Sequence, residues 1–254
     1  MISKNQVKLI SSLQQKKFRK EHGLFIVEGE KVCRELIESG WAMHAVFMTA
    51  KFREEKFSTW SKKTSYEIVT DKELEKISAL TTPQQILAIA EMPALKFNFG
   101  LLKKSLTLML DDIKDPGNLG TMIRIADWFG IATVICSETC ADIYNPKTVQ
   151  STMGSLFRVN VFYEKLNVVL EKCPGEKIPV YGTLLNGENV YQKKLYSESV
   201  IIIGSESHGI SDELIQYITD KIHIPSFSKS QNKKADSLNA AMAAAIICSE
   251  FRRR

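Results

Sequence analysis

The sequence predicts an α/β protein in which a small α/β part is followed by a larger, mostly parallel α/β part. Short apolar and β-branched runs alternate with segments of helical spacing along the whole chain, which is typical of strands joined by helices. The run at residues 106–110 is continuously apolar, as expected of a strand covered on both faces. A stretch without clear period separates the two parts. We therefore expect a first domain of residues 1–93, a linker of residues 94–105 and a second domain of residues 106–254.

The first part contains elements of both kinds. Apolar residues at helical spacing predict a helix over residues 7–13 that leads into a basic run. A second helix, residues 29–39, should end at Gly40 as its C-cap. A third, residues 71–77, should have Asp71 as its N-cap. Apolar and β-branched runs predict four strands, at residues 24–27, 45–48, 66–69 and 86–90.

Strands and helices alternate more regularly in the second part. Pro146 suits the first turn of a helix, and Asn118 and Ser237 can cap the helices that they precede. Two predicted helices span residues 118–129 and 237–251. Two more begin at residue 145 and near residue 211. The predicted strands lie at residues 106–110, 132–136, 159–162, 180–184, 200–203 and 222–224. This alternation indicates a mostly parallel sheet with ligand sites at the carboxyl ends of its strands.

The composition fits an ordinary globular protein and excludes several classes. The chain has 254 residues, of which 44% are hydrophobic and 25% charged, which argues against disorder or a fibrous repeat. No apolar stretch reaches the roughly 18 residues of a membrane span, and the first residues lack the apolar core of a secretion signal. The five cysteines include one close pair, Cys136 and Cys140, and the four histidines are scattered. We therefore expect a cytoplasmic protein with free thiols and with no bound metal or membrane.

An excess of positive charge lies in the first part. The net charge is +5, and residues 1–100 carry 16 Lys and Arg against 12 Asp and Glu. Basic groups hold RNA through its phosphates. The basic run therefore supplies candidate RNA contacts, which are Lys16, Lys17, Arg19 and Lys20. The same run also fits an ordinary solvated helix face, and charge by itself leaves both interpretations open.

Three loops of the second part carry residues that suit a ligand site, and the first is residues 115–124. Gly120 permits close approach of a backbone or a ligand, and Arg124 follows Asn118 by less than two helical turns. The loop lacks the Gly-Lys-Ser/Thr of a Walker loop and the third glycine of a dinucleotide-binding turn. Taken alone, it also fits a tight turn followed by a surface arginine.

The second loop, residues 204–210, follows a buried strand and holds Glu206 between two glycines. Main-chain groups at a strand end suit an adenine or ribose edge, and Glu206 can orient a polar ligand. The third loop begins at residues 223–225, continues through a lysine-rich segment to residue 236 and, at residues 237–239, opens an alanine-rich helix whose small side chains allow close packing. Taken alone, the second loop also fits a glycine-rich turn whose acid caps a helix. The third, taken alone, also fits an ordinary buried alanine-rich helix. His208 fits a loop residue better than a catalyst.

Together, and in this order, the three loops resemble the motifs of the SpoU (TrmH) branch of the SPOUT RNA methyltransferases, over residues 106–254. The matching residues are Asn118-x-Gly120-x3-Arg124, then Gly204-Ser205-Glu206-x2-Gly209, then Ile224-Pro225 followed by Ser237-Leu238-Asn239. The first part resembles the substrate-binding extension of this family at residues 25–29 and 83–88. Residues 226–236 depart from the pattern, because the segment is longer than usual and lacks the common methionine and glycine. Its lysines 229, 233 and 234 fit either RNA contacts or a soluble loop.

The resemblance implies an enzyme that transfers a methyl group from S-adenosylmethionine to a ribose 2′-hydroxyl of structured RNA, with ribosomal RNA favoured over transfer RNA. It also implies a trefoil knot in the second part and a homodimer. The implied cofactor-binding residues are Thr183, Gly204, Glu206, Ile224, Leu238 and Asn239. The implied catalytic residues are Asn118, Arg124, Glu206, Ser237 and Asn239, of which Arg124 is also an expected RNA contact.

Two questions stay open at the level of the sequence. Arg124 matches an arginine that is often proposed to deprotonate the 2′-hydroxyl, yet a guanidinium group has a pKa above about 12. Binding the neighbouring phosphate and stabilising the developing alkoxide is therefore the physically easier role. The alternative function is a non-catalytic RNA-binding or ribosome-assembly protein that retains the fold. A nucleotide-dependent oxidoreductase would need a glycine fingerprint that the chain lacks.

Overall fold

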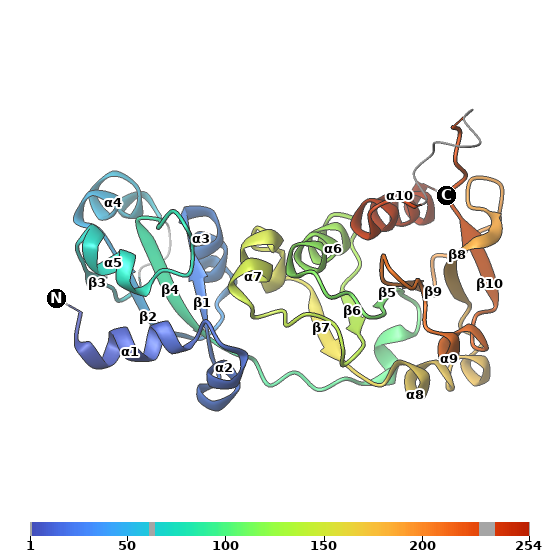
Figure 1. Cartoon of the computed structure of the whole chain (residues 1–254), viewed down its shortest axis with the longest axis horizontal. Helices are drawn as coiled ribbons and strands as arrows, with labels where there is room; N and C mark the ends of the chain where they lie inside the picture. The colour runs from blue at the N-terminus through green and yellow to red at the C-terminus, as the bar shows by residue number, and fades with distance from the viewer. Residues whose placement is uncertain (1, 61–63, 229–236, 254) are drawn as a thin grey trace. The chain divides into compact units, whose positions relative to one another are not determined.

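The computed structural model describes residues 2–60, 64–228 and 237–253. The chain forms two compact units (Figure 1). Unit 1 comprises residues 1–94 and 142–158, and unit 2 comprises residues 95–141 and 159–254. The segment 142–158 thus belongs to unit 1, although it follows the first strands of the predicted second domain. The domain boundaries themselves stay a prediction.

Unit 1 is built on a four-stranded sheet with the order β1-β4-β2-β3. In this sheet β4 pairs antiparallel with β1 and β2, and β2 pairs parallel with β3. The strands are β1 (Leu24–Glu28), β2 (Met43–Met48), β3 (Glu67–Ile68) and β4 (Ile86–Glu91). The helices are α1 (Lys4–Ser12), α2 (Lys16–His22), α3 (Glu30–Ser39), α4 (Ala50–Glu55), α5 (Asp71–Ile77) and α7 (Pro146–Thr152), with the 3-10 helices η1 (Phe57–Thr59) and η3 (Ser155–Phe157). One part of the core lies where α1 and α5 cover the sheet, around Leu13, Phe47 and Ile77.

The local sequence explains where several helices of unit 1 begin and end. α1 starts after Ser3 and α5 after Thr70, each in a capping box closed by the side chain three residues further on. Thr70 is therefore the N-cap of α5, and the prediction of Asp71 at that position was wrong by one residue. Gly40 ends α3 with a φ of 79°, which confirms the predicted glycine C-cap.

Residues 142–158 pack within unit 1 against the first part of the chain. The ring centroids of Tyr144 and Phe25 lie 4.7 Å apart. Gly154 has a φ of +97°, and a Cβ atom at this position would lie 2.5 Å from Cγ of Glu35. Only glycine combines this backbone conformation with so close a neighbour, so the segment is closely fitted to α3.

Unit 2 is built on a six-stranded sheet with the order β10-β8-β9-β5-β6-β7, in which every pair of neighbours is parallel. The strands are β5 (Leu106–Leu110), β6 (Thr133–Cys136), β7 (Asn160–Tyr163), β8 (Val180–Asn189), β9 (Ser199–Ile203) and β10 (Asp220–His223). The helices are α6 (Pro116–Trp128), α8 (Leu166–Leu170), α9 (Asp212–Ile215) and α10 (Ala240–Arg253), with the 3-10 helices η2 (Phe99–Leu102) and η4 (Pro174–Glu176). This architecture confirms the predicted α/β class with a mostly parallel second sheet. The trefoil knot stays a prediction.

α6 and α10 lie side by side and are joined at both ends (Figure 1). Near their starts, the side chain of Asn239 donates to that of Asn118 at 3.1 Å. Near their ends, the guanidinium group of Arg252 donates to the carbonyl oxygens of Phe129 at 2.7 Å and Gly130 at 2.9 Å. The two helices therefore run parallel. Since α6 follows β5 directly, both helices begin at the carboxyl edge of the sheet.

β8 extends beyond its predicted end at residue 184 because it pairs with β10 twice. Tyr181 lies opposite Asp220, and Asn189 lies opposite His223, with a register shift between the two pairings. In the intervening segment, a Cβ atom on Gly187 would lie 2.5 Å from the backbone of Ile222. The chain therefore passes β10 there at a distance that no side chain would permit.

Candidate active site

The first loop is fixed by a cap at the start of α6. The carboxylate of Asp115 accepts a hydrogen bond from the backbone N–H of Asn118 at 2.8 Å, and Pro116 occupies the first helical turn. Asp115 is therefore the N-cap, and the prediction that Asn118 caps this helix was wrong. Asn118 lies inside the first turn instead, where its side-chain amide is available to a neighbouring loop.

The second loop folds back on itself at the carboxyl end of β9. Ser205 and Gly209 exchange two backbone hydrogen bonds of 2.9 Å each. A Cβ atom on Gly204 would lie 2.1 Å from the carbonyl carbon of Gly209, so the glycine is required by space. The loop thereby holds Glu206 at an exposed tip.

The third loop ends in the cap of α10. The side-chain oxygen of Asn239 accepts hydrogen bonds from the backbone N–H groups of Ala241 at 3.0 Å and Met242 at 3.2 Å. Asn239 is therefore the N-cap of this helix. The prediction that Ser237 caps it was wrong, because the helix begins three residues later than expected.

Asn118, Glu206 and Asn239 join the three loops at one point of unit 2. Oε1 of Glu206 accepts hydrogen bonds from the side-chain amide of Asn118 at 3.1 Å and of Asn239 at 2.5 Å. The same oxygen accepts a third bond from the backbone N–H of Ala240 at 3.1 Å. A carboxylate placed at the start of a helix is favoured by the partial positive charge of the unpaired N–H groups. The arrangement thus fixes a polar junction between segments more than 80 residues apart in sequence.

The other predicted residues of the second part have no direct bond to this junction. The guanidinium group of Arg124 is exposed on α6 and, within the described residues, has no hydrogen-bond or ion-pair partner. The hydroxyl of Thr183 donates to the carbonyl oxygen of Ile202 at 3.0 Å. Ile224 is half-buried, and Ser237 and Leu238 are exposed. The lysines of the segment 226–236 lie outside the described residues.

The basic run on α2 divides into exposed and buried side chains. Lys16, Lys17 and Lys20 are exposed. Arg19 is only 2% exposed, forms an ion pair with Asp142 at 2.6 Å and donates to two backbone carbonyl oxygens of the preceding turn. Its donors are engaged within unit 1, so we remove Arg19 from the set of candidate RNA contacts.

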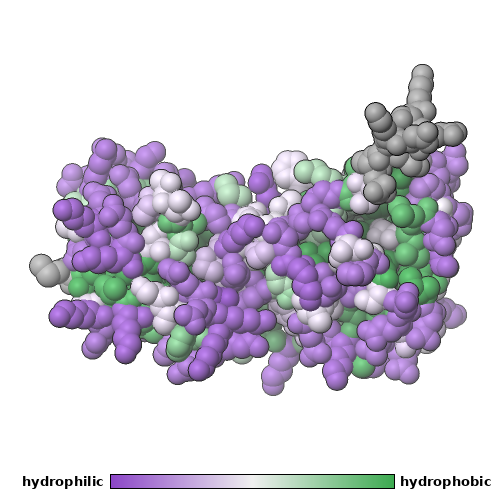
Figure 2. Space-filling model, in the orientation of Figure 1, coloured by the Kyte–Doolittle hydropathy of each residue, from purple (hydrophilic) through white to green (hydrophobic). Residues whose placement is uncertain are grey.

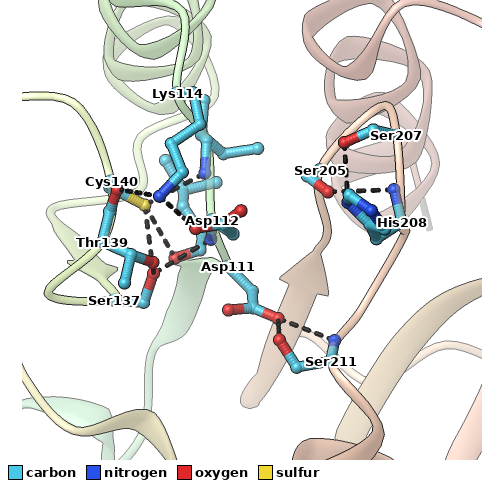
Figure 3. Close-up of polar contacts among 12 residues, drawn as sticks. Asp111, Asp112, Lys114, Ser137, Thr139, Cys140, Ser205, Ser207, His208 and Ser211 are labelled. Atoms are coloured by element: carbon cyan, nitrogen blue, oxygen red, sulfur yellow. Dashed lines mark hydrogen bonds and ion pairs between the residues drawn. The ribbon is translucent and has the colours of Figure 1, made fainter.

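Sequence reasoning missed the residues that place the first two loops relative to each other. Asp111 directly follows β5, and its carboxylate accepts hydrogen bonds from the backbone N–H of Ser211 at 2.8 Å and from its hydroxyl at 2.6 Å (Figure 3). This carboxylate is buried, so the bonds tie the end of β5 to the residue that follows the second loop. An acid at the end of a continuously apolar strand was the available signal.

A hollow of about 390 Å³ opens at the carboxyl ends of β5, β6 and β7. None of Asn118, Glu206 and Asn239 lines it. Its lining includes five carboxylates, on Asp111, Asp112, Glu138, Glu164 and Glu213, which would repel a phosphate group. In the described ranges, no group of three His, Cys, Asp or Glu side chains could hold a metal ion, and no helix is long and apolar enough to cross a membrane. The junction of the three loops is therefore the candidate active site.

Two family models match the chain. The model of the SpoU rRNA Methylase family matches residues 105–249, which include all three loops. The model of the MRM3-like substrate binding domain matches residues 4–88. The two matches together cover most of the chain.

Two relatives match over most of the length of both chains. The chain is 32% identical over 252 residues to the 23S rRNA (guanosine(2553)-2′-O)-methyltransferase RlmP of Bacillus subtilis, covering 98% of this chain and 97% of that protein. It is 28% identical to a 23S rRNA (uridine(2479)-2′-O)-methyltransferase of Streptomyces viridochromogenes, covering 91% and 83%.

Solved structures share the fold of the whole chain. A TrmH-family protein from Porphyromonas gingivalis superposes with a TM-score of 0.88 at 36% identity, covering 100% of this chain and 99% of that one. An AdoMet-bound rRNA methyltransferase from Sinorhizobium meliloti superposes with a TM-score of 0.80 at 27% identity, covering 100% and 97%. The extent of these matches and the convergence of the three loops lead to one conclusion: the chain belongs to the SpoU rRNA methylase family.

Proposed function

We propose that this SpoU-family enzyme uses S-adenosylmethionine to methylate the ribose 2′-hydroxyl of a nucleotide in large-subunit ribosomal RNA. The observation that carries the proposal is the hydrogen-bonded junction of Asn118, Glu206 and Asn239. It brings together the three loops whose residues the resemblance to the family assigns to this chemistry. The two curated relatives are named for 2′-O-methylation of 23S rRNA, which supports the choice of RNA. An enzyme of this kind would work in the cytoplasm.

The residues around the junction fit S-adenosylmethionine, which when bound supplies an electrophilic methyl group on a sulfonium sulfur. The backbone of the second loop offers polar partners, and Asn239 holds that loop through Glu206, while Ile224 and Leu238 offer apolar surface that is not fully buried. Small-ligand sites commonly combine apolar walls with a few placed polar groups. The hydroxyl of Thr183 donates its proton to the carbonyl oxygen of Ile202, which leaves its oxygen to accept a hydrogen bond from a ligand. We therefore assign cofactor binding to Thr183, Gly204, Glu206, Ile224, Leu238 and Asn239.

Arg124 is the residue that we assign to the RNA and to the transition state. Its guanidinium group is exposed and presents five N–H donors in a planar fork. It can bind a phosphate with two parallel hydrogen bonds and stabilise the alkoxide that develops when the 2′-hydroxyl loses its proton. Asn118, Ser237 and Asn239 would orient the target ribose and the cofactor beside it.

We also propose that the enzyme works as a homodimer. Figure 2 shows hydrophobic side chains gathered on unit 2 where β8 and β9 lie. The exposed large apolar side chains of β8, the third loop and α10 are Leu185, Phe227, Leu238 and Met242. An exposed apolar surface of this kind is typical of an interface. In such a dimer Arg124 of one subunit could serve the cofactor site of its partner.

Transfer of a radiolabelled methyl group to deproteinised 23S rRNA tests the proposed reaction. The label should appear in a dinucleotide that resists alkaline hydrolysis, because a 2′-O-methyl group blocks attack on the adjacent phosphate. Label in an alkali-sensitive nucleotide would show base methylation, and RNA binding without transfer would favour a non-catalytic protein. Either outcome would overturn the proposal.

Substitution of Arg124 tests the assigned role. Arg124→Ala should lower kcat about 100-fold or more, since the loss of one well-placed donor to a developing oxyanion costs about 100- to 1,000-fold. Arg124→Lys should also be impaired, because lysine lacks the planar fork. An unchanged circular dichroism spectrum and melting temperature would show that the variants remain folded. Full transfer by Arg124→Ala would refute the role.

A further inference from the structure

A turn after β6, residues 137–141, holds the segment that leads from β5 to α6 (Figure 3). The backbone N–H of Ser137 donates to the carbonyl oxygen of Leu110 at 2.9 Å, and its hydroxyl accepts from the N–H of Asp112 at 2.9 Å. Further along, the N–H of Ala141 donates to the carbonyl oxygen of Ile113 at 2.8 Å. The turn thus binds this segment along its length.

Cys140 lies at the centre of this contact. Its sulfur accepts a hydrogen bond from the backbone N–H of Ile113 at 3.3 Å and donates one to the carbonyl oxygen of Leu110 at 3.3 Å. One sulfur atom therefore bridges the two ends of residues 110–113, which comprise the last residue of β5 and the three residues after it. The side chain is buried.

The segment held in this way has an uncommon backbone conformation at one residue. Asp112 has a φ of 57°, a left-handed conformation that is uncommon for residues other than glycine, although Asp adopts it more often than most of them. Its carboxylate pairs with Lys114 at 2.6 Å, and Lys114 in turn donates to the carbonyl oxygen of Thr139 at 2.9 Å. The 137–141 turn therefore supplies partners for a conformation that the segment would not keep alone.

We propose that Cys140 is a positioning residue for the methyl transfer, whose sulfur sets residues 110–113 and thereby the start of α6 with Asn118 and Arg124. This inference rests on the proposed function. Asp115, the cap of α6, lies two residues after Ile113, and Asn118 lies five residues after Ile113. A shift of the segment would therefore move the helix start, and with it the bond between Asn118 and Glu206.

The test compares Cys140→Ala with Cys140→Ser and with Cys173→Ala. Cys173 is a matched control, because it is also a buried free cysteine, but within the described part of the chain its sulfur bonds only to the carbonyl of Val169 in the adjoining helix. Cys140→Ala should lower kcat about 10- to 100-fold, as small displacements of reacting groups do, with the KM for RNA within about twofold. Cys140→Ser should restore most of kcat, because a hydroxyl also donates and accepts. Cys173→Ala should keep the kcat of the wild type.

Hydrogen exchange separates a failure of this inference from a failure of the proposed function. The amides of Ile113 and Asn118 should exchange faster in Cys140→Ala than in the wild type and in Cys173→Ala, whatever reaction the enzyme performs. If the wild type transfers no methyl group to a 2′-hydroxyl, the proposed function fails while this readout still applies. Unchanged exchange at both amides, or equal losses of kcat in the two alanine variants, would overturn the positioning role.

Discussion

One oxygen atom of Glu206 accepts three hydrogen bonds, from Asn118, Asn239 and Ala240. Hydrogen bonds to an ionised acceptor are shorter and stronger than neutral ones, so this carboxylate can hold three loops together from an exposed position. It reaches that position because the second loop closes over Gly204, which has no room for a side chain. Gly204 and Glu206 therefore both contribute to the same junction.

Gly204→Ala is expected to open the second loop. The added Cβ atom would lie 2.1 Å from the backbone of Gly209, and a backbone neighbour, unlike a long side chain, cannot rotate away. The clash should cost about 1–3 kcal/mol of folding free energy and should lower kcat by displacing Glu206. Thermal unfolding and methyl transfer measure the two effects.

Gly175→Ala is the matched control for this prediction. It lies in the same unit, and an added Cβ atom there meets nothing within 4 Å. It should leave both the melting temperature and kcat unchanged. Wild-type behaviour of Gly204→Ala would show that the loop adjusts without cost.

At the scale of elements, the exposed lysines of α2 should contribute to RNA affinity. Replacing Lys16, Lys17 and Lys20 together with alanine should weaken the binding of 23S rRNA. The slope of log affinity against log salt should also fall by about 2 to 3, because each lost phosphate contact removes about 0.7 to 0.9. Filter binding between about 50 and 200 mM salt measures both quantities.

Three exposed lysines of α4 and α5, namely Lys51, Lys72 and Lys76, provide a control with the same change of charge. Their replacement should change the salt slope less than replacement of the lysines of α2. Equal slopes for the two triple variants would mean that only the overall charge matters, and α2 would then lose its role in RNA binding.

The capping box of α5 makes the stability of unit 1 depend on pH. Hydrogen bonds from the backbone and side chain of Thr70 lower the pKa of Glu73 below its ordinary value of 4.5. A carboxyl group whose pKa is lower in the folded state stabilises the fold above the ordinary value and loses this contribution as the pH falls through the folded pKa. Glu73→Gln should therefore be less stable than the wild type above pH 4.5, with a difference that shrinks as the pH falls further below this value. Urea unfolding at several pH values measures it, and a constant difference would contradict the prediction.

The elements also show what a single sequence can and cannot predict. The buried strands of unit 2 were predicted within one or two residues at most ends, because continuous apolar runs mark them directly. Helix starts were displaced at Asn118 and Ser237, because several nearby polar residues can cap and only the backbone path selects one. The end of β8 was missed, because residues 183–187 leave the regular pairing with β10.

The same contrast applies to the candidate site. Asn118, Glu206 and Asn239 were found because they stand at fixed places in recognisable loops. Asp111 and Cys140 were missed because their partners are backbone groups or residues about 25 to 100 positions away, which leave no spacing to detect. Arg19 was misread because charge alone does not reveal a buried partner, here Asp142.

At the scale of the whole molecule, a single substitution on α10 should dissociate the proposed homodimer. Met242 is 60% exposed at the start of α10, and a charge there would be costly in an apolar interface. Met242→Glu should therefore sediment as a monomer at concentrations where the wild type is a dimer, and its methyl transfer should fall. Analytical ultracentrifugation measures the first effect.

Val168→Glu is the control, because Val168 is 46% exposed on α8 of the same unit. It should leave the dimer intact. A wild-type protein that sediments as a monomer at every concentration, or equal effects of the two substitutions, would contradict the proposed interface.

The packing of residues 142–158 within unit 1 limits how this protein can be divided or recombined. A fragment that stops at residue 94 would retain Phe25 without Tyr144 and Arg19 without Asp142. A chimera that exchanges only the region matched by the substrate-binding family, residues 4–88, would set foreign side chains against the native segment. Successful transplantation of unit 1 into another enzyme therefore requires carrying two separate stretches of the gene.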